Sequence, residues 1–166
     1  LKLIDYLNRI PNLWEPPNAT TKNGYQTEDQ LFDLQNDMLN ELEKIVRLKI
    51  DDYYEEYKSR SSVFISRWPT IKKMKSWYVR LIQGGYQDAH MHSLGWLSGV
   101  VYLNTIEHPK NGEGSIEFGL HGYNYKILNS NIPRQQHQPS NGDLVLFPSS
   151  LFHKTIPIQQ NSERSI

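Results

Sequence analysis

Two histidines one residue apart, with an aspartate just before them, are the first residues whose spacing points to chemistry. They belong to the segment Gly84-Gly85-Tyr86-Gln87-Asp88-Ala89-His90-Met91-His92. Because side chains of a β-strand alternate between its two faces, Asp88, His90 and His92 would all point the same way. Two imidazoles beside a carboxylate can grip one metal ion from one side. The competing interpretation is a polar, solvent-facing strand edge in which the histidines only form hydrogen bonds.

A second group of candidate residues lies near the end of the chain. The run Gly142–Pro148 predicts a turn, a strand and an abrupt stop, and His153, which follows it, would supply a third metal ligand. If Lys154–Pro157 and the segment from Arg164 onward are neighbouring antiparallel strands, Arg164 would point into the same cavity. A planar guanidinium there suits a carboxylate, which it binds through two parallel hydrogen bonds. Taken alone, Arg164 would be a surface arginine.

Composition narrows the kind of site these residues can form. The chain has 166 residues, no cysteine and six histidines, so thiolate zinc sites, iron–sulfur clusters, disulfides and cysteine nucleophiles are excluded. Any metal must therefore be bound by His, Asp or Glu.

With 18 basic and 18 acidic side chains there is no electrostatic case for a nucleic-acid partner. The sequence contains no apolar run of the ~20 residues that a membrane span needs. No signal peptide is visible in the first ten residues, so we expect a cytoplasmic protein.

The length predicts one domain, in which an N-terminal flank covers residues 1–60 and a β core covers 61–166. Residues 11–26 are rich in Pro, Gly and Asn and predict a loop. Apolar residues at steps of three and four, after a capping-box pair Thr27 and Gln30, predict an amphipathic helix over 28–58. This helix is expected to be scaffold. The core would be cut short at Ile166, with the chain a fragment of a longer protein.

Beyond residue 60 the pattern changes to short segments rich in β-branched and aromatic residues, separated by Gly, Asn and Pro. This pattern is typical of a mainly β jelly roll, with the helix packed outside and the irregular 119–140 region near one mouth. The expected strands are Val63–Trp68, Trp77–Ile82, Gln87–His92, Trp96–Leu103, Ser115–Phe118, Asp143–Phe147 and Lys154–Pro157.

The order of these motifs resembles the 2-oxoglutarate and Fe(II)-dependent oxygenases, and within them a prolyl hydroxylase-like set with His-x-His before Trp-Leu-Ser-Gly. The resemblance covers roughly 76–166. It is carried by His90-Met91-His92-Ser93-Leu94-Gly95-Trp96-Leu97-Ser98-Gly99-Val100-Val101-Tyr102-Leu103, Glu113-Gly114-Ser115-Ile116-Glu117-Phe118 and Leu146-Phe147-Pro148-Ser149-Ser150-Leu151-Phe152-His153.

The resemblance implies a double-stranded β-helix, cupin-like in shape, that encloses Fe(II). His90 and His153 would be the first and distal ligands, and Arg164 would bind the distal carboxylate of 2-oxoglutarate. The implied reaction is hydroxylation of a C–H bond, with decarboxylation of 2-oxoglutarate to succinate. The prime substrate is then a peptide side chain or a small molecule; the oligomeric state is left open.

Position 92 departs from the broader family pattern, because most members have a carboxylate two residues after the first histidine. Three interpretations remain open. His92 is a third imidazole ligand, so that His90, His92 and His153 form the catalytic centre; Asp88 supplies the carboxylate; or the site binds another metal and performs no oxidation. Beside Arg164, the serine that many members have two residues later is replaced by Ile166.

Three side chains are weaker candidates for cosubstrate contact. Arg80 would reach the cavity or lie at the surface, while Tyr102 and Ser98 share one strand face. Trp96 is interpreted as packing at a strand start rather than as a substrate platform. The alternatives to the oxygenase are a cupin-like three-histidine metalloenzyme that does not use 2-oxoglutarate, and a metal-free jelly-roll binding module.

Overall fold

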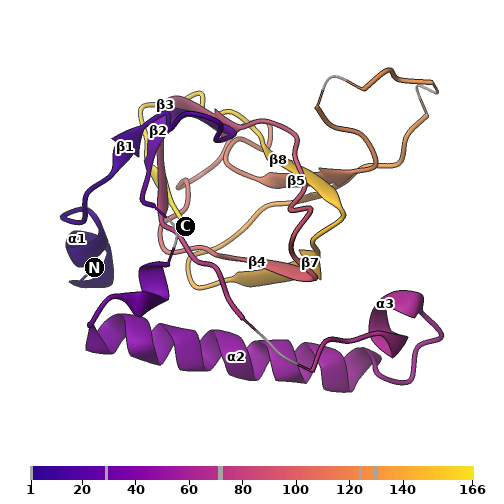
Figure 1. The fold of residues 1–166 in the computed structure, drawn as a ribbon. Coiled ribbons are helices and arrows are strands. Elements are labelled where there is room, and N and C mark those ends of the chain that lie inside the picture. The colour runs from indigo at the N-terminus through magenta and orange to yellow at the C-terminus, as the bar shows by residue number, and fades with distance from the viewer. Residues whose placement is uncertain (1, 29, 71–72, 124, 129–130) are drawn as a thin grey trace.

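A computed structural model describes residues 2–28, 30–70, 73–123, 125–128 and 131–166. Its strands form a barrel that lies on a long helix (Figure 1). The helical elements are α1 (Lys2–Leu7), the 3-10 turn η1 (Leu31–Asp33), α2 (Asp37–Tyr57) and α3 (Val63–Ser66). The strands are β1 (Leu13–Trp14), β2 (Thr21–Gln26), β3 (Val79–Gln87), β4 (Leu97–Val101), β5 (Ile116–Gly119), β6 (Gln135–His137), β7 (Leu144–Pro148), β8 (Phe152–Thr155) and β9 (Arg164–Ser165).

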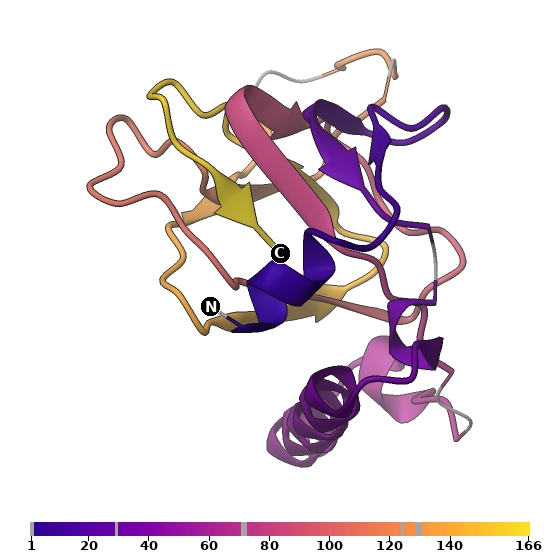
Figure 2. The same cartoon turned by 90° about the vertical axis from the view of Figure 1, so that its left-hand side faces the viewer.

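The strands pair antiparallel in three sheets, in the orders β1-β2-β3-β9, β4-β7 and β6-β5-β8. Single bridges connect them: His90 pairs with His153 of β8, and Asn104 pairs with Ser165 of β9. Viewed from the side, the sheets enclose a common interior (Figure 2). The predicted fold class, mainly β with a helical flank at the N-terminal side, agrees with this arrangement.

The helix α2 lies along the β4–β7 side of the barrel (Figure 1). It begins nine residues later than the predicted start at residue 28, because Asn36 is its N-cap and accepts hydrogen bonds from the backbone N–H groups of Met38 and Leu39. The expected capping residue Thr27 has another role. Its hydroxyl accepts the N–H of Tyr78 at 2.9 Å and so closes the sheet beside β3.

Two local predictions from the sequence were wrong. Residues 11–26 are not all loop, since β1 and β2 lie in them, and Gly24 is a strand residue whose missing side chain leaves room for Leu81: a Cβ there would lie 2.7 Å from Leu81 Cδ2. The run Val63–Trp68 is not a strand but contains α3, whose Phe64 packs on Tyr53 of α2. A short apolar run has no decisive period, and here contact with the helix decides its structure.

The interior has three groups of buried side chains. One joins α1, η1 and α2 to the barrel through Leu7, Leu31, Leu39 and Tyr78. The other two fill the barrel from the β3 side and from the β4–β5–β7 side. No helix in the described part of the chain is both long and apolar enough to cross a bilayer.

Candidate metal centre

Three histidines meet at one end of the barrel because the backbone holds their two chain segments side by side. The N–H of His90 donates to the carbonyl of His153 at 3.0 Å, and the N–H of His153 donates back to the carbonyl of His90 at 2.9 Å. The N–H of His92 donates to the carbonyl of Ser149 at 2.9 Å, just before β8. The predicted strand over residues 87–92 is thus a single bridge at His90 beyond the end of β3.

The imidazoles of His90, His92 and His153 form a compact triad. One potential ligand atom from each lies within 4.8 Å of the other two, and no other group of three or more His, Cys, Asp or Glu side chains among the described residues is this close. Ring centroids are 4.3 to 5.2 Å apart. His90 and His153 are buried and His92 is half-buried, so a metal here would be largely shielded from water.

Asp88, the alternative ligand, does not join this triad. Its carboxylate side chain is exposed, and it is its backbone carbonyl that approaches His90, accepting a hydrogen bond from Nδ1 at 2.6 Å. Asp88 therefore orients the imidazole of His90 through its backbone carbonyl, and its carboxylate lies outside the triad.

The hydrogen bonds of His90 and His153 leave one nitrogen of each of these two rings available to a metal. A carbonyl oxygen can only accept, so the bonds from His90 Nδ1 to Asp88 and from His153 Nδ1 to Leu151 (3.1 Å) place protons on both Nδ1 atoms and leave both Nε2 lone pairs free. His92 Nδ1 lies 2.9 Å from Ser98 Oγ, which in turn lies 2.7 Å from Ser149 Oγ. Outer hydrogen bonds of this kind fix the orientation and tautomer of metal-binding histidines.

Burial keeps the triad uncharged. It lowers the pKa of His92 to about 4 and that of His153 to about 3, in both cases mainly through desolvation and then through repulsion from His90. The pKa of His90 is lowered by desolvation as well, although its hydrogen bond to Asp88 opposes the shift. All three imidazoles are therefore neutral at pH 7, the state in which they bind metals.

Arg164 is a buried cation within reach of the same interior. It lies on β9, where Leu81 of β3 is its register partner, so its strand does not pair with Lys154–Pro157, the arrangement considered from the sequence. Its Nη1 nevertheless donates to Thr155 Oγ1 of β8 at 3.3 Å, and its guanidinium carbon lies 4.9 Å from the ring centre of Tyr102.

The charge of Arg164 has no partner among the described acidic side chains. Its Nε atom and the hydroxyl of Tyr102 are both buried, and neither has a hydrogen-bond partner in the described part of the chain. Desolvation lowers the pKa of Arg164 from its ordinary value. A buried cation without a counter-charge is costly, so this end of the interior is suited to an anion.

One cavity of about 900 Å³ connects the triad with Arg164. Its lining includes all three histidines, Thr155 and Arg164. Arg80 is not among the lining residues: its guanidinium carbon instead lies 4.5 Å from the ring centre of Tyr25 of β2. The expected cosubstrate contact of Arg80 therefore has no support in the geometry, whereas Tyr102 reaches the cavity only through Arg164.

The family is shown by a match over residues 75–166 to the family model described as "Putative 2OG-Fe(II) oxygenase", where 2OG is 2-oxoglutarate. The chain belongs to this family. It is thus a 2-oxoglutarate-dependent dioxygenase, with iron(II) as its cofactor and 2-oxoglutarate as its cosubstrate, as the sequence resemblance predicted. No curated protein matches the sequence significantly.

Two solved structures are similar to this one. One is a prolyl-4-hydroxylase from Pseudomonas putida, with a TM-score of 0.59 and 14% identity over 99% of this chain and 77% of that chain. The other is HygX from Streptomyces hygroscopicus with nickel and 2-oxoglutarate bound, with a TM-score of 0.59 and 14% identity over 99% of this chain and 74% of that chain. These similarities confirm the predicted double-stranded β-helix.

Several residues that shape the site escaped the analysis of the sequence. Ser149, in the turn after β7, supports the triad and Thr155 of β8 supports Arg164, but a lone hydroxyl carries no signal of its own. Tyr123 was missed as well: its hydroxyl bonds to both the N–H and the carbonyl of Met91, between the two histidines. Trp68 and Trp77 line the cavity, and the one available signal was that three of the four tryptophans lie within 68–96.

Proposed function

We propose that this enzyme hydroxylates a C–H bond of its prime substrate, with dioxygen as oxidant and 2-oxoglutarate as co-reductant. One oxygen atom of O2 would enter the substrate as a hydroxyl group. The other would enter succinate, which forms from 2-oxoglutarate with loss of CO2. Iron(II), when bound, supplies the activation of dioxygen that this reaction needs.

His90, His92 and His153 are the proposed ligands of the iron. Their neutral charge, their converging ring nitrogens and their outer hydrogen bonds support this assignment. A set of three imidazoles carries one negative charge fewer than the common two-histidine, one-carboxylate set. We therefore expect the site to favour anionic co-ligands, which compensate the charge of the metal.

The proposed binding partner of the distal carboxylate of 2-oxoglutarate is Arg164. This buried cation, which has no acidic partner among the described residues and lies in the same cavity as the triad, is the observation that carries the proposal. The Arg164 Nε–H and the Tyr102 hydroxyl are two donors that lack acceptors among the described residues, and Thr155 holds the guanidinium from the β8 side. A carboxylate in the cavity would accept hydrogen bonds from the guanidinium of Arg164 and neutralise its charge.

Uncoupled turnover tests this function without knowledge of the prime substrate. The protein is loaded with Fe(II), supplied with 2-oxoglutarate and oxygen, and assayed for succinate; slow formation is expected. The Arg164→Met variant should bind metal but lose 2-oxoglutarate binding. Metal binding without 2-oxoglutarate binding in the wild type would instead favour the cupin-like three-histidine enzyme. Absence of stoichiometric metal binding would refute the proposal at its first step.

A further inference from the structure

The cavity extends well beyond the triad and Arg164, and its outer part is walled by tryptophans. Trp68, Trp77 and Trp96 all line it, and the ring of Trp77 meets that of His92 edge to face at 5.6 Å. A cavity of about 900 Å³ is at the upper end of the range typical of small-molecule sites. The five-carbon 2-oxoglutarate fills only a small part of it, which leaves room for a second organic molecule beside the metal.

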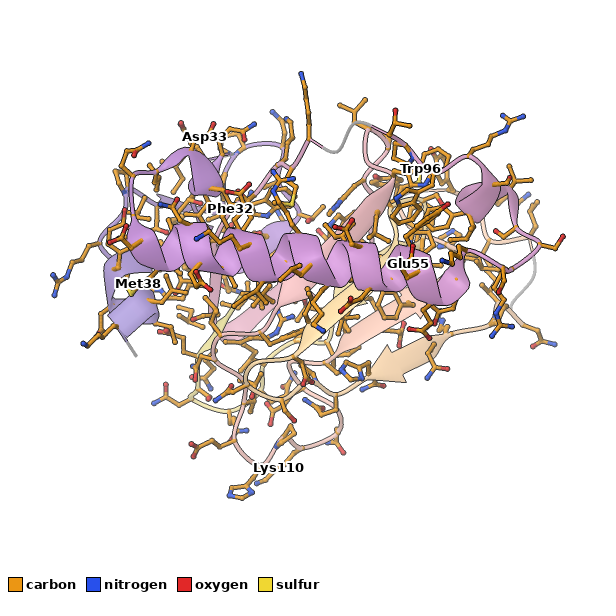
Figure 3. All side chains as sticks on the ribbon, turned by 90° about the horizontal axis from the view of Figure 1, so that it is seen from below. Phe32, Asp33, Met38, Glu55, Trp96 and Lys110 are labelled. Atoms are coloured by element: carbon orange, nitrogen blue, oxygen red, sulfur yellow. The ribbon has the colours of Figure 1, made fainter. Side chains whose placement is uncertain are left out.

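Two of the tryptophan rings are held in place by an aromatic cluster at the C-terminal end of α2. Trp96 is stacked on Phe64 of α3, with ring centres 5.5 Å apart and planes 8° apart. Trp68 is stacked on Tyr53 of α2 at 5.9 Å and meets Phe64 edge to face at 5.6 Å. Figure 3 shows Trp96 near Glu55, at this end of the helix. Trp96 is therefore both packed at its strand start, as predicted, and part of the wall.

Among the described residues, the charged side chains that line the cavity are all cationic. The lining residues include Lys73, Lys75, Lys154 and Arg164 but no Asp or Glu among those that the structure describes. Lys154 pairs with Glu117 at 3.2 Å, outside the lining. The indole Nε1–H of Trp68 is buried and has no acceptor within the described residues, although an indole donor inside a protein normally has one.

We propose that this outer part binds the prime substrate and that the substrate is a small aromatic acid. The inference rests on the proposed function and names the substrate class for the same site. The flat ring of the substrate lies against the tryptophan wall, and an acceptor atom of the substrate receives a hydrogen bond from the Trp68 N–H. The anionic group of the substrate is stabilised by the cationic lining, of which Lys73 is a part. Arg164 and the metal remain occupied by 2-oxoglutarate.

Calorimetric titration with 1-naphthoate tests the proposal, with 1-naphthamide and 1-naphthylmethylammonium as neutral and cationic probes of similar shape. The protein carries Mn(II) and saturating 2-oxoglutarate, whose own binding is measured first. We expect 1-naphthoate to bind in addition to 2-oxoglutarate, the amide to bind at least about tenfold more weakly, and the ammonium not to bind. Absence of 2-oxoglutarate binding would refute the proposed function. Binding of 2-oxoglutarate without binding of 1-naphthoate would refute only the substrate class.

Matched variants identify the residues responsible. Trp68→Phe keeps an aromatic ring but removes the N–H, and loss of one hydrogen bond should weaken 1-naphthoate binding about threefold to tenfold. Trp14→Phe, on β1 outside the cavity lining, should leave it unchanged. Lys73→Met should narrow the difference between naphthoate and naphthamide, and Lys22→Met on β2 should not.

Three results would overturn the proposal. The first is equal affinity for all three probes, which would show that the wall does not select an anion. The second is displacement of 2-oxoglutarate by 1-naphthoate, which would show that the acid binds at Arg164. The third is an equal effect of Trp68→Phe and Trp14→Phe, which would remove the indole N–H from the site.

Discussion

Replacing Ser98 with alanine tests whether His92 binds the metal. Ser98 is buried, and its hydroxyl lies 2.9 Å from His92 Nδ1 and 2.7 Å from Ser149 Oγ. The methyl group of alanine would remove the contact of Nδ1 with Ser98, so the ring of His92 would lose the hydrogen bond that fixes its orientation. If His92 is a ligand, this loss must appear in the affinity for metal.

The expected magnitude follows from the role of the bond. Loss of an outer hydrogen bond to a metal-binding histidine typically weakens metal affinity about 10-fold to 100-fold, or about 1.4 to 2.7 kcal/mol. Ser149→Ala keeps the bond between His92 and Ser98 and removes only its outer support, so we expect a smaller loss. The unfolding free energy of the metal-free protein should fall more in Ser98→Ala than in Ser149→Ala, because the first variant loses the contacts of Ser98 with both His92 and Ser149 and the second loses only the contact between the two serines.

The assay is competition for Fe(II) or Mn(II) against a chelator of known affinity, at fixed pH. Ser115→Ala is the matched control, since this buried hydroxyl bonds to Gly112 and lies away from the triad. Asp88→Asn should retain wild-type affinity, because only the backbone carbonyl of Asp88 touches His90. Unchanged affinity in Ser98→Ala together with a large loss in Asp88→Asn would refute the three-histidine assignment.

Three further predictions concern charge and stability. Arg164→Met should not lower the unfolding free energy of the metal-free protein in denaturant titrations, because it replaces a buried cation that has no acidic partner among the described residues with an apolar side chain of similar length; a marked loss would mean that the charge is paired in the folded state. Glu113 accepts the N–H groups of Lys110, Gln159 and Gln160, and these bonds, that of Lys110 first, hold the pKa of its carboxyl below its usual range. Its stabilisation is therefore full above the unfolded-state pKa and is lost as the pH falls through the folded one, so Glu113→Gln should destabilise the protein at pH 7 and less so in acid; a difference independent of pH would contradict this. Asn36→Ala should destabilise the protein by about 1 kcal/mol through loss of the α2 cap, measured by thermal unfolding, while the exposed Asn40→Ala inside the helix should not.

The parts of the fold that the sequence predicts well are those in which local pattern and tertiary environment agree. The strands around Leu97–Val101 and Leu144–Pro148 have β-branched and aromatic residues bounded by turn residues, and both lie close to their predicted ranges. Where the two levels disagree, tertiary contacts prevail. Thr27 has the spacing of a helix cap, but its hydroxyl is used by Tyr78, whose position in the sheet no local pattern reveals.

The candidate site shows the same division. Residue type and order were enough to name His90, His92, His153 and Arg164, because few side chains bind metals or carboxylates and these four have family-like spacing. Their supports could not be named in the same way. Thr155 approaches Arg164 from a strand of another sheet, and Asp88 contributes a backbone carbonyl, which every residue has. That the carboxylate of Asp88 lies outside the triad could thus be seen only in the structure.

The mutual backbone hydrogen bonds of His90 and His153 also determine when this site exists during folding. The two residues are far apart in the sequence, so no local segment of the unfolded chain can present both imidazoles to one ion. The bonds form only once β8 has reached the end of β3, a long-range pairing with a high loop-closure entropy. A metal bound by both residues would therefore connect the two segments. Its binding free energy would add to the stability of the folded barrel, and it would slow the opening of this end.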